Sequence, residues 1–259
     1  MNTVQYLIDK IKSAPELDFG NIFNASIDLF KKSWLQGFLM QIISVLIMIP
    51  FFILIYGPII AAAIAQEGSR GYSDGTWDGI FAGLGILYIA GVIVAILVLG
   101  SAVTAIQAAF FVILKKYDHN ETVHTNDFFM FLKGPYLGKI LGLLAMTILI
   151  SIPAALLCYL PLIYVLVPLN LFVPFFAFNP HLGVMDIVKV SFSLGNKKWL
   201  ILFGLIIISS LLAQIVGILA CGIGVLFTAA FIYHPVYKVY KQVIGFDDKS
   251  SVPINHIVE

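Results

Sequence analysis

Four runs of this sequence contain no charged residue, and each run is longer than one membrane span requires. They cover residues 33–66, 79–114, 140–185 and 199–237, and they hold 34, 36, 46 and 39 residues. A helix that crosses the hydrocarbon core of a bilayer needs about 20 apolar residues at about 1.5 Å each. The runs therefore predict helices that cross a membrane.

The composition agrees with a location in lipid. Hydrophobic residues make up 60% of the 259 residues, charged residues make up 11%, and the net charge is +1. A soluble domain carries about 25% charged residues, so this chain lacks the charge to cover a water-facing surface. Disorder, coiled coils and nucleic-acid binding each require a polar or strongly charged chain. We therefore expect an integral membrane protein that is surrounded by the lipid bilayer and has no nucleic-acid partner.

The runs predict six spans of unequal length. The last two runs are each long enough for two spans and a tight turn, whereas the first two are interpreted as one long span each. The expected spans cover residues 35–58, 80–106, 138–157, 161–179, 199–217 and 222–240. The first two helices would be about 50 Å long. They are therefore expected to tilt, to kink at Pro50 or Pro58, or to project beyond the bilayer.

The lysines predict the orientation of the chain. If the N-terminus lies inside, all fourteen lysines fall on one side of the membrane and Arg70 is left for the other. Cytoplasmic loops are enriched in positive residues, so we expect a bacterial inner-membrane protein with both termini in the cytoplasm. In this topology Trp34 and Trp199 are expected to anchor the inner interface, and Trp77 the outer one.

A short pattern recurs ahead of three of the spans. Residues 26–35 and 191–200 share a Ser, a Leu, a Lys and a Trp-Leu pair at equal spacing, and residues 127–136 form a weaker third copy. We expect an all-α membrane protein in which a unit of one interfacial amphipathic helix and one transmembrane hairpin occurs three times. The chain is then a single membrane domain, 1–259, with repeats at 18–114, 125–180 and 181–241 and short cytoplasmic tails at 1–17 and 242–259.

The first copy of the pattern contains an apolar stripe. Phe23, Ile27, Phe30 and Trp34 follow one another at intervals of four, three and four residues, which places them on one face of a helix. Such a stripe is typical of a helix that lies in the membrane interface. The alternative is that it packs on the protein's own cytoplasmic loops, and the two arrangements are compatible.

Further motifs carry a resemblance to a known group. They are the Ser-Leu-Lys-Lys-Trp-Leu lead-in, Pro161 to Tyr164 with Pro168, Asn179-Pro180, and the closing stretch from Tyr233 to Tyr240. In these motifs the chain resembles a broad group of bacterial six-span proteins that includes the membrane domain of glycerophosphoryl diester phosphodiesterases. The resemblance implies the six-span fold but no catalytic residue, because the phosphodiesterase chemistry of such relatives belongs to a separate soluble domain. The expected cytoplasmic segments are each shorter than the roughly 40 to 50 residues that such a domain needs.

Charged side chains are scarce inside the expected spans. No Asp, Glu or Arg falls within them, and Lys139 and Lys238 lie near inner ends, where their side chains are expected to reach water. Pumps and ion-coupled carriers usually hold the coupling ion or proton on an intramembrane ionisable group, so the sequence disfavours that class. His234, next to Pro235, is interpreted as a packing or interfacial residue.

The fourth span is the most irregular one. Pro161, Pro168, Pro174 and Pro180 recur every six or seven residues, and Asn170 lies between the middle two. Each proline leaves a carbonyl group without its helical partner, and Asn170 adds an amide at mid-membrane depth. Pro168, Asn170 and Pro174 are therefore candidate contacts to a polar cavity or to a partner helix. The structural alternative is a curved helix in which Asn170 bonds to a neighbour's backbone.

Small residues indicate where helices approach closely. Gly134, Gly138 and Gly142 form a tandem GxxxG pattern at the start of the third span. They are expected to pack against the protein's own helices, and contact with a partner subunit is the alternative.

The two cysteines, Cys158 and Cys221, are both expected at outer turns of neighbouring hairpins. The bacterial periplasm permits disulfides, so a bridge between them is one hypothesis. Two free thiols that pack as small hydrophobic groups are the alternative.

The segment 117–127 gathers two histidines and three acids. The spacing of His119 and His124 fits no common metal-binding motif, and a loop of this length without cysteine rarely holds a metal alone. We interpret it as a solvated linker in which Thr125 or Asn126 caps the next helix. The chain contains no nucleophile triad, phosphate loop or dinucleotide motif, so no catalytic residue, metal or other cofactor is expected.

These observations favour a non-catalytic role. We expect an accessory or scaffold subunit of a larger membrane assembly, for example in protein export or envelope biogenesis, with other integral membrane proteins as partners. A carrier or flippase for a lipid-like amphiphile is the alternative, because it needs no intramembrane charge, and its site would be the fourth span. A membrane enzyme is a third alternative, for which the segment 119–127 offers the one polar cluster near an interface. A cavity beside Asn170 would favour the carrier, and lateral contact with another subunit would favour the scaffold.

Overall fold

The computed structural model describes residues 2–68, 85–157, 159–220 and 222–246. Within these ranges the chain forms helices and no strands. Five of the described helical segments are long and apolar enough to cross a membrane: Phe19–Ala61, Tyr88–Asp118, Gly134–Leu156, Leu160–Phe178 and Trp199–Leu219. The expectation of an all-α chain with several membrane-crossing helices is therefore confirmed.

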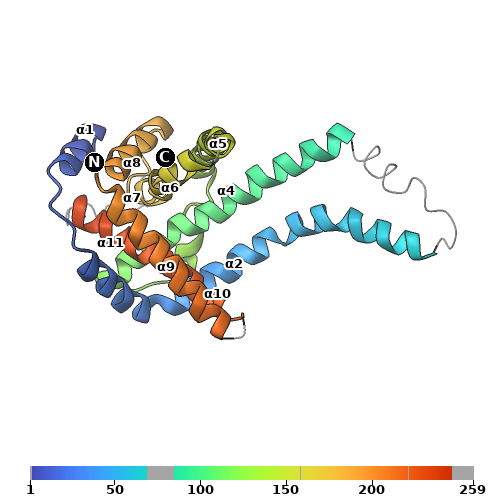
Figure 1. The fold of residues 1–259 in the computed structure, drawn as a ribbon, viewed down its shortest axis with the longest axis horizontal. Helices are drawn as coiled ribbons and strands as arrows, with labels where there is room; N and C mark the ends of the chain where they lie inside the picture. The colour runs from blue at the N-terminus through green and yellow to red at the C-terminus, as the bar shows by residue number, and fades with distance from the viewer. Residues whose placement is uncertain (1, 69–84, 158, 221, 247–259) are drawn as a thin grey trace.

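Figure 1 shows how the helices are arranged. The longest are α2 (Phe19–Gly68), α4 (Gly85–Asp118), α5 (Gly134–Leu156) and α9 (Trp199–Leu219). Shorter elements lie between and beside them: α1 (Val4–Lys12), η1 (Thr125–Phe129), α6 (Leu160–Asn170), α7 (Phe172–Phe178), α8 (Val184–Lys197), α10 (Val225–Thr228), η2 (Ala229–Ile232) and α11 (Tyr233–Val243). The amphipathic helix α1 lies in the segment expected as a short cytoplasmic tail, residues 1–17. It contacts α8 and buries Leu7 and Ile11.

Helices α2 and α4 extend together away from the rest of the molecule (Figure 1). With 50 and 34 residues they are about 75 Å and 51 Å long, compared with a bilayer core of about 30 Å. α2 continues through Pro50 and Pro58 without ending. Pro58 has no N–H to bond the Leu54 carbonyl, which accepts instead from the Tyr88 hydroxyl of α4 at 3.0 Å. The side chain of one helix thus satisfies the backbone of the other.

The core lies where the C-terminal half of α4 meets α7 and α11. Phe111, Phe175, Phe176 and Tyr240 are buried there, and the rings of Phe175 and Tyr240 meet edge to face with centroids 5.2 Å apart. Each aromatic side chain of this kind buries about 150–250 Å². This aromatic core therefore holds the α6–α7 segment against α4 and α11.

The segment expected as the sixth span is divided into three short elements. α10, η2 and α11 follow one another from Val225 to Val243, and none of them has the length of a membrane-crossing helix. The 3-10 stretch lies against α2 so closely that a Cβ on Gly37 would be 2.7 Å from the Cβ of Ala230. The Thr228 hydroxyl donates to a carbonyl of α9, and the three elements run back along α9 (Figure 1). Tight packing against α2 and α9 therefore determines the conformation of this segment, which does not form one regular α-helix.

The three expected repeats differ in structure. In the first, the lead-in is continuous with the long helix α2, and in the third it is a separate helix, α8, which ends before Trp199. In the second it is only η1, a five-residue 3-10 helix, because Pro135 requires α5 to begin anew at Gly134. The first and third copies share two buried positions: Ser26 matches Ser191, and Leu29 matches Leu194.

The apolar stripe of α2 packs on the protein's own chain. The rings of Phe23 and Phe30 lie 5.8 and 5.4 Å from the ring of Phe231, and Trp34 lies 6.1 Å from Phe227. The most deeply buried face is displaced by one residue from the expected stripe, and it contains Ile22, Ser26, Leu29 and Ser33. The stripe therefore covers the α10–η2 segment rather than a loop.

Candidate functional site

The fourth expected span breaks at its prolines. α6 ends at Asn170, α7 begins at Phe172, and Pro174 has no N–H to donate to the carbonyl of Asn170. The Asn170 amide donates to the Leu166 carbonyl at 2.8 Å. The suggestion that Asn170 bonds to a neighbour's backbone is therefore wrong, because its amide reaches the preceding turn of its own helix. Its amide oxygen makes no hydrogen bond to the described parts of the chain.

The carbonyl that Pro168 leaves free has a partner from another helix. This is the Tyr164 carbonyl, which accepts a hydrogen bond from Nε1 of Trp199 at 3.0 Å. The two rings also stack, with centroids 6.5 Å apart. Trp199 therefore ties α9 to the broken helix, a role beyond the expected interfacial anchor. Trp34 is 44% exposed, and Trp77 lies outside the described residues.

A cavity of about 290 Å³ opens beside Asn170. Its walls come from α4, α5, α6, α7, η2 and α11. Five polar side chains line it, and all five are half-buried: Thr104, Gln107, Thr147, Asn170 and Tyr233. The rest of the lining is apolar, and no charged residue belongs to it. The break in the fourth span thus faces a partly enclosed, uncharged polar site.

Several hydrogen-bonding groups of this cavity are unused. The hydroxyls of Thr104 and Thr147 donate to carbonyls of their own helices at 2.8 and 2.9 Å, which leaves the oxygens able to accept. The Gln107 amide and the Tyr233 hydroxyl make no hydrogen bond to any residue that the structure describes. These groups are half-buried and face the cavity, so they are available to a ligand or to water. Gln107 was missed because the search of the sequence was for charge, and a single Gln in an apolar run is the signal that could have found it.

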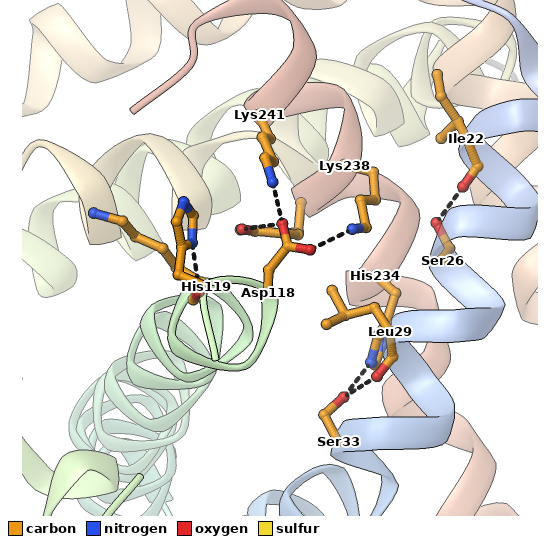
Figure 2. Close-up of polar contacts among 11 residues, drawn as sticks. Ile22, Ser26, Leu29, Ser33, Asp118, His119, His234, Lys238 and Lys241 are labelled. Atoms are coloured by element: carbon orange, nitrogen blue, oxygen red, sulfur yellow. Dashed lines mark hydrogen bonds and ion pairs between the residues drawn. The ribbon is translucent and has the colours of Figure 1, made fainter. Parts of the chain in front are cut away.

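An ionic cluster joins two walls of the cavity. Asp118 at the end of α4 accepts hydrogen bonds from Tyr237, Lys238 and Lys241 of α11 at 2.9, 2.8 and 2.6 Å (Figure 2). The side chains of Asp118 and Lys238 are each only 13% exposed. The expectation that Lys238 reaches water is therefore wrong, because Asp118 offers a nearby opposite charge. The cluster holds α11 against α4.

His234 is a packing residue. It is fully buried among the rings of Phe30, Phe110 and Phe231, with centroids 5.3 to 5.9 Å away. Its Nε2 lies 2.9 Å from Oγ of Ser33 on α2 (Figure 2), and its Nδ1 lies 3.1 Å from the Ala230 carbonyl. The ring thus joins α2 to α11 and does not line the cavity.

Asn179 connects three further segments. Its amide donates to the Tyr240 hydroxyl of α11 at 2.8 Å, and its oxygen accepts from Asn2 at 3.0 Å. Next to it, the Pro180 carbonyl accepts from Lys139 at 2.7 Å, so this lysine also bonds to the protein. The N-terminal segment, the end of α7 and α11 therefore meet at one buried polar group.

The glycine prediction holds for one residue of three. A Cβ on Gly142 would lie 2.9 Å from the side chain of Val184 on α8, which is a close approach between helices. A Cβ on Gly134 or Gly138 would meet nothing within 4 Å. These two glycines are therefore not packing positions within the described residues. Cys158 and Cys221 lie outside them, so the disulfide hypothesis stays a prediction.

The His119–Asp127 segment is organised by Asp127. Its carboxylate accepts from Lys116 at 2.7 Å and from the backbone N–H of His124 at 2.9 Å. The N-cap of η1 is therefore His124, and the expectation that Thr125 or Asn126 caps the helix is wrong because Asp127 closes a capping box. Across the ranges that the structure describes, no three His, Cys, Asp or Glu side chains gather as metal ligands.

A scan against protein-family models found no match to this chain, and searches of curated proteins and of solved structures found no match either.

Proposed function

We propose that this chain is a non-catalytic scaffold or accessory subunit of a larger membrane assembly. The part that contacts the partner is the arm, defined as residues 45–64 of α2 and 88–98 of α4. Integral membrane proteins, for example those of an export or envelope-building assembly, are the proposed partners. The observation that carries this proposal is that little of the arm is buried within the protein itself.

Most of the apolar surface of the arm is uncovered. Only 11% of the most apolar stretch of α2 and 17% of that of α4 are buried within the protein. The corresponding values are 17% for α5, 33% for α9 and 50% for Leu160–Phe178. Ile53 is 65% exposed, and Ile60 and Ile93 are more than half exposed. The α2 part of the arm has 20 residues and is about 30 Å long, which matches the bilayer core. Its exposed surface is therefore open to lipid or to a partner helix, and a partner helix can pack on it by van der Waals contact.

We also propose a bacterial inner-membrane location with both termini in the cytoplasm. Support comes from lysines that are distant in sequence but meet the same end of the molecule. Lys197 and Lys198 donate to the carbonyls of Lys12 and Pro15 in the N-terminal segment. Asn179 in turn links that segment to α11, which carries Lys238 and Lys241. A fluorescent protein fused after residue 259 is expected to be bright, as it is in the cytoplasm. A reporter enzyme that works only in the periplasm, fused at the same position, is expected to be inactive. A dark fluorescent fusion together with an active periplasmic reporter would contradict the topology.

Site-specific crosslinking tests the scaffold. A photoreactive amino acid is placed at Ile53 in the arm and, as a matched control, at Leu219 on α9, which is 79% exposed. We expect the arm position to give one reproducible protein adduct in cells, identified by mass spectrometry. The control position is expected to give lipid adducts. If both positions give lipid adducts alone, the arm faces lipid and the scaffold proposal fails.

A carrier for a lipid-like amphiphile is the second candidate, because the cavity lies beside Asn170 at the break between α6 and α7. Broken helices line the substrate sites of many carriers. The test is transbilayer movement of a fluorescent lipid in vesicles that contain the purified protein. Faster movement than in empty vesicles supports the carrier, and equal rates remove it.

A further inference from the structure

We infer that the cavity beside Asn170 is a binding site for an uncharged amphiphile, whose polar head group bonds to Gln107, Asn170 and Tyr233 and whose hydrocarbon chain lies against the apolar walls. A monoacylglycerol has this chemistry. This ligand class also applies to the carrier candidate, because both proposals place their site in the same cavity. Binding requires no transport.

The lining determines that the head group is uncharged. No acidic or basic side chain belongs to the cavity wall, and Asp118, Lys238 and Lys241 satisfy one another outside it. A charged head group placed there would lose its hydration without gaining an opposite charge, which disfavours its binding. An uncharged head group avoids this cost.

The unused groups determine that the head group both donates and accepts. Gln107 offers an N–H donor and a carbonyl acceptor, Asn170 offers its free amide oxygen, and the Tyr233 hydroxyl can do either. They come from three different elements, α4, α6 and α11, so they surround a common space. Glycerol hydroxyls and an ester match such a set, whereas a pure hydrocarbon leaves all three groups without partners.

The walls suit a hydrocarbon chain. Phe111, Phe172 and Phe176 contribute aromatic surface, and aliphatic side chains complete the lining. The volume of about 290 Å³ lies at the lower end of the range of about 300–1,000 Å³ for small-molecule sites. It therefore accommodates a head group and the first part of one chain, while the rest of the chain extends into the bilayer. A single-chain lipid fits this arrangement better than a two-chain phospholipid.

The site is preorganised by contacts that lie outside it. The Asp118 cluster fixes α11 to α4, and the rings of Tyr233 and Phe111 meet edge to face with centroids 5.7 Å apart. Tyr233 and Gln107 therefore keep their places without a ligand. A rigid site lowers the entropy cost of binding.

The experiment is photolabelling of the full-length protein in nanodiscs. The probe is a monooleoylglycerol with a diazirine in its acyl chain, and it is compared with photoreactive oleic acid and photoreactive oleylamine of the same chain length. Labelled peptides are mapped by mass spectrometry. We expect the glycerol probe to label peptides that line the cavity, to be displaced by unlabelled monooleoylglycerol, and to label them at least tenfold more than either charged probe.

Two variants remove head-group contacts and leave the fold intact. Gln107→Leu and Tyr233→Phe each delete a polar group that has no hydrogen-bond partner among the described residues. Each is expected to lower cavity labelling about fivefold, the equivalent of one hydrogen bond. The matched control is Gln214→Leu, the same change at an exposed position of α9 that lies outside the cavity. It is expected to label like the unmodified protein.

The inference is overturned by any of three results: no labelling of the lining peptides, equal labelling by the charged probes, or labelling that neither variant lowers more than the control. Its failure is distinct from failure of the proposed functions. Specific labelling without faster lipid movement leaves the binding site and removes the carrier. A crosslinked partner at Ile53 supports the scaffold whatever the cavity binds.

Discussion

At the scale of single residues, prolines inside helices create acceptors that neighbouring helices use. Pro58 frees the Leu54 carbonyl for the Tyr88 hydroxyl, and Pro168 frees the Tyr164 carbonyl for Nε1 of Trp199. In lipid no water is available to satisfy a free carbonyl, so each such contact is stronger than its surface position suggests. The prolines thus act as attachment points between helices.

The Trp199→Phe substitution tests this role. It removes the donor to the Tyr164 carbonyl and is expected to lower the free energy of unfolding by about 1–2 kcal/mol. Trp34→Phe is the control, because Trp34 is 44% exposed and its indole N–H makes no hydrogen bond to the described chain. Denaturant titration of both variants in one detergent measures the difference. Equal losses would show that ring size, and not the hydrogen bond, accounts for the effect.

At the scale of elements, α11 is held by charge on one side and by close packing on the other. Asp118 binds it to the end of α4, and η2, which leads into it, contacts α2 at Gly37. Because of these two contacts, the segment expected as the sixth span, residues 222–240, does not form a regular spanning helix. They also place Tyr233 in the wall of the cavity.

The charge contact predicts a large effect for Asp118→Asn. Removing one partner of a mostly buried ion pair leaves Lys238 without its counter-charge, and we expect a loss of about 2–4 kcal/mol. The control is Asp28→Asn, because Asp28 forms an exposed pair with Lys31 that is worth about 0–1 kcal/mol. Unfolding in detergent compares the two variants. A loss for Asp118→Asn no larger than for Asp28→Asn would contradict the role of the cluster.

Two glycine substitutions are expected to change the stability of the protein in opposite directions, because only one of the glycines lies at a close contact. Gly37→Ala places a methyl group 2.7 Å from the Cβ of Ala230 and is expected to destabilise the protein by about 1–3 kcal/mol. Gly138→Ala meets nothing within 4 Å, so the better helix propensity of Ala is expected to stabilise the protein by up to about 1 kcal/mol. Melting curves in the same detergent measure both changes. Destabilisation by Gly138→Ala would instead indicate contact with a partner subunit at this face.

At the scale of the whole molecule, the protein divides into a compact part, in which many helices pack together, and an arm of two helices that leaves most of its apolar surface exposed. The compact part contains the aromatic core, the cavity and the ionic cluster, whereas the arm exposes long aliphatic side chains such as Ile53 and Ile89. Stability and lateral contact are therefore expected to depend on different residues. This separation is what a subunit with an extended contact surface needs.

The division predicts where truncation is tolerated. Leu205→Ala in the buried face of α9 is expected to lower the free energy of unfolding by about 2–5 kcal/mol, because it leaves a cavity in a packed core. Ile53→Ala in the arm is expected to change it by less than about 1 kcal/mol and to weaken co-purification of the partner that crosslinking identifies. Unfolding and partner recovery are measured on the same preparations. A large loss of stability for Ile53→Ala would show that the arm belongs to the core.

The sequence predicted the helices well and the site only in part. The proline and Asn170 pattern indicated the break in the fourth span and a possible cavity there, because proline acts on its own backbone wherever it lies. Gln107 was missed because it carries no charge, although a single Gln in an apolar run marks it, and Tyr233 was missed because it is not unusual in its own segment. Asp118 was missed for the same reason: it follows two lysines at the end of an apolar run, and its partners lie more than 100 residues later.

The sequence alone determined that the chain is helical and suited to lipid, because the absence of charge and the need to satisfy every backbone group act locally along the chain. The sequence alone also showed that the lysines lie between the apolar runs and not within them. Only the tertiary structure decided that the segment expected as the sixth span folds as three short elements, that Lys238 pairs with Asp118, and that Gln107, Asn170 and Tyr233 surround one cavity. These features depend on which helices approach closely, and close approach is a property of packed side chains from distant segments.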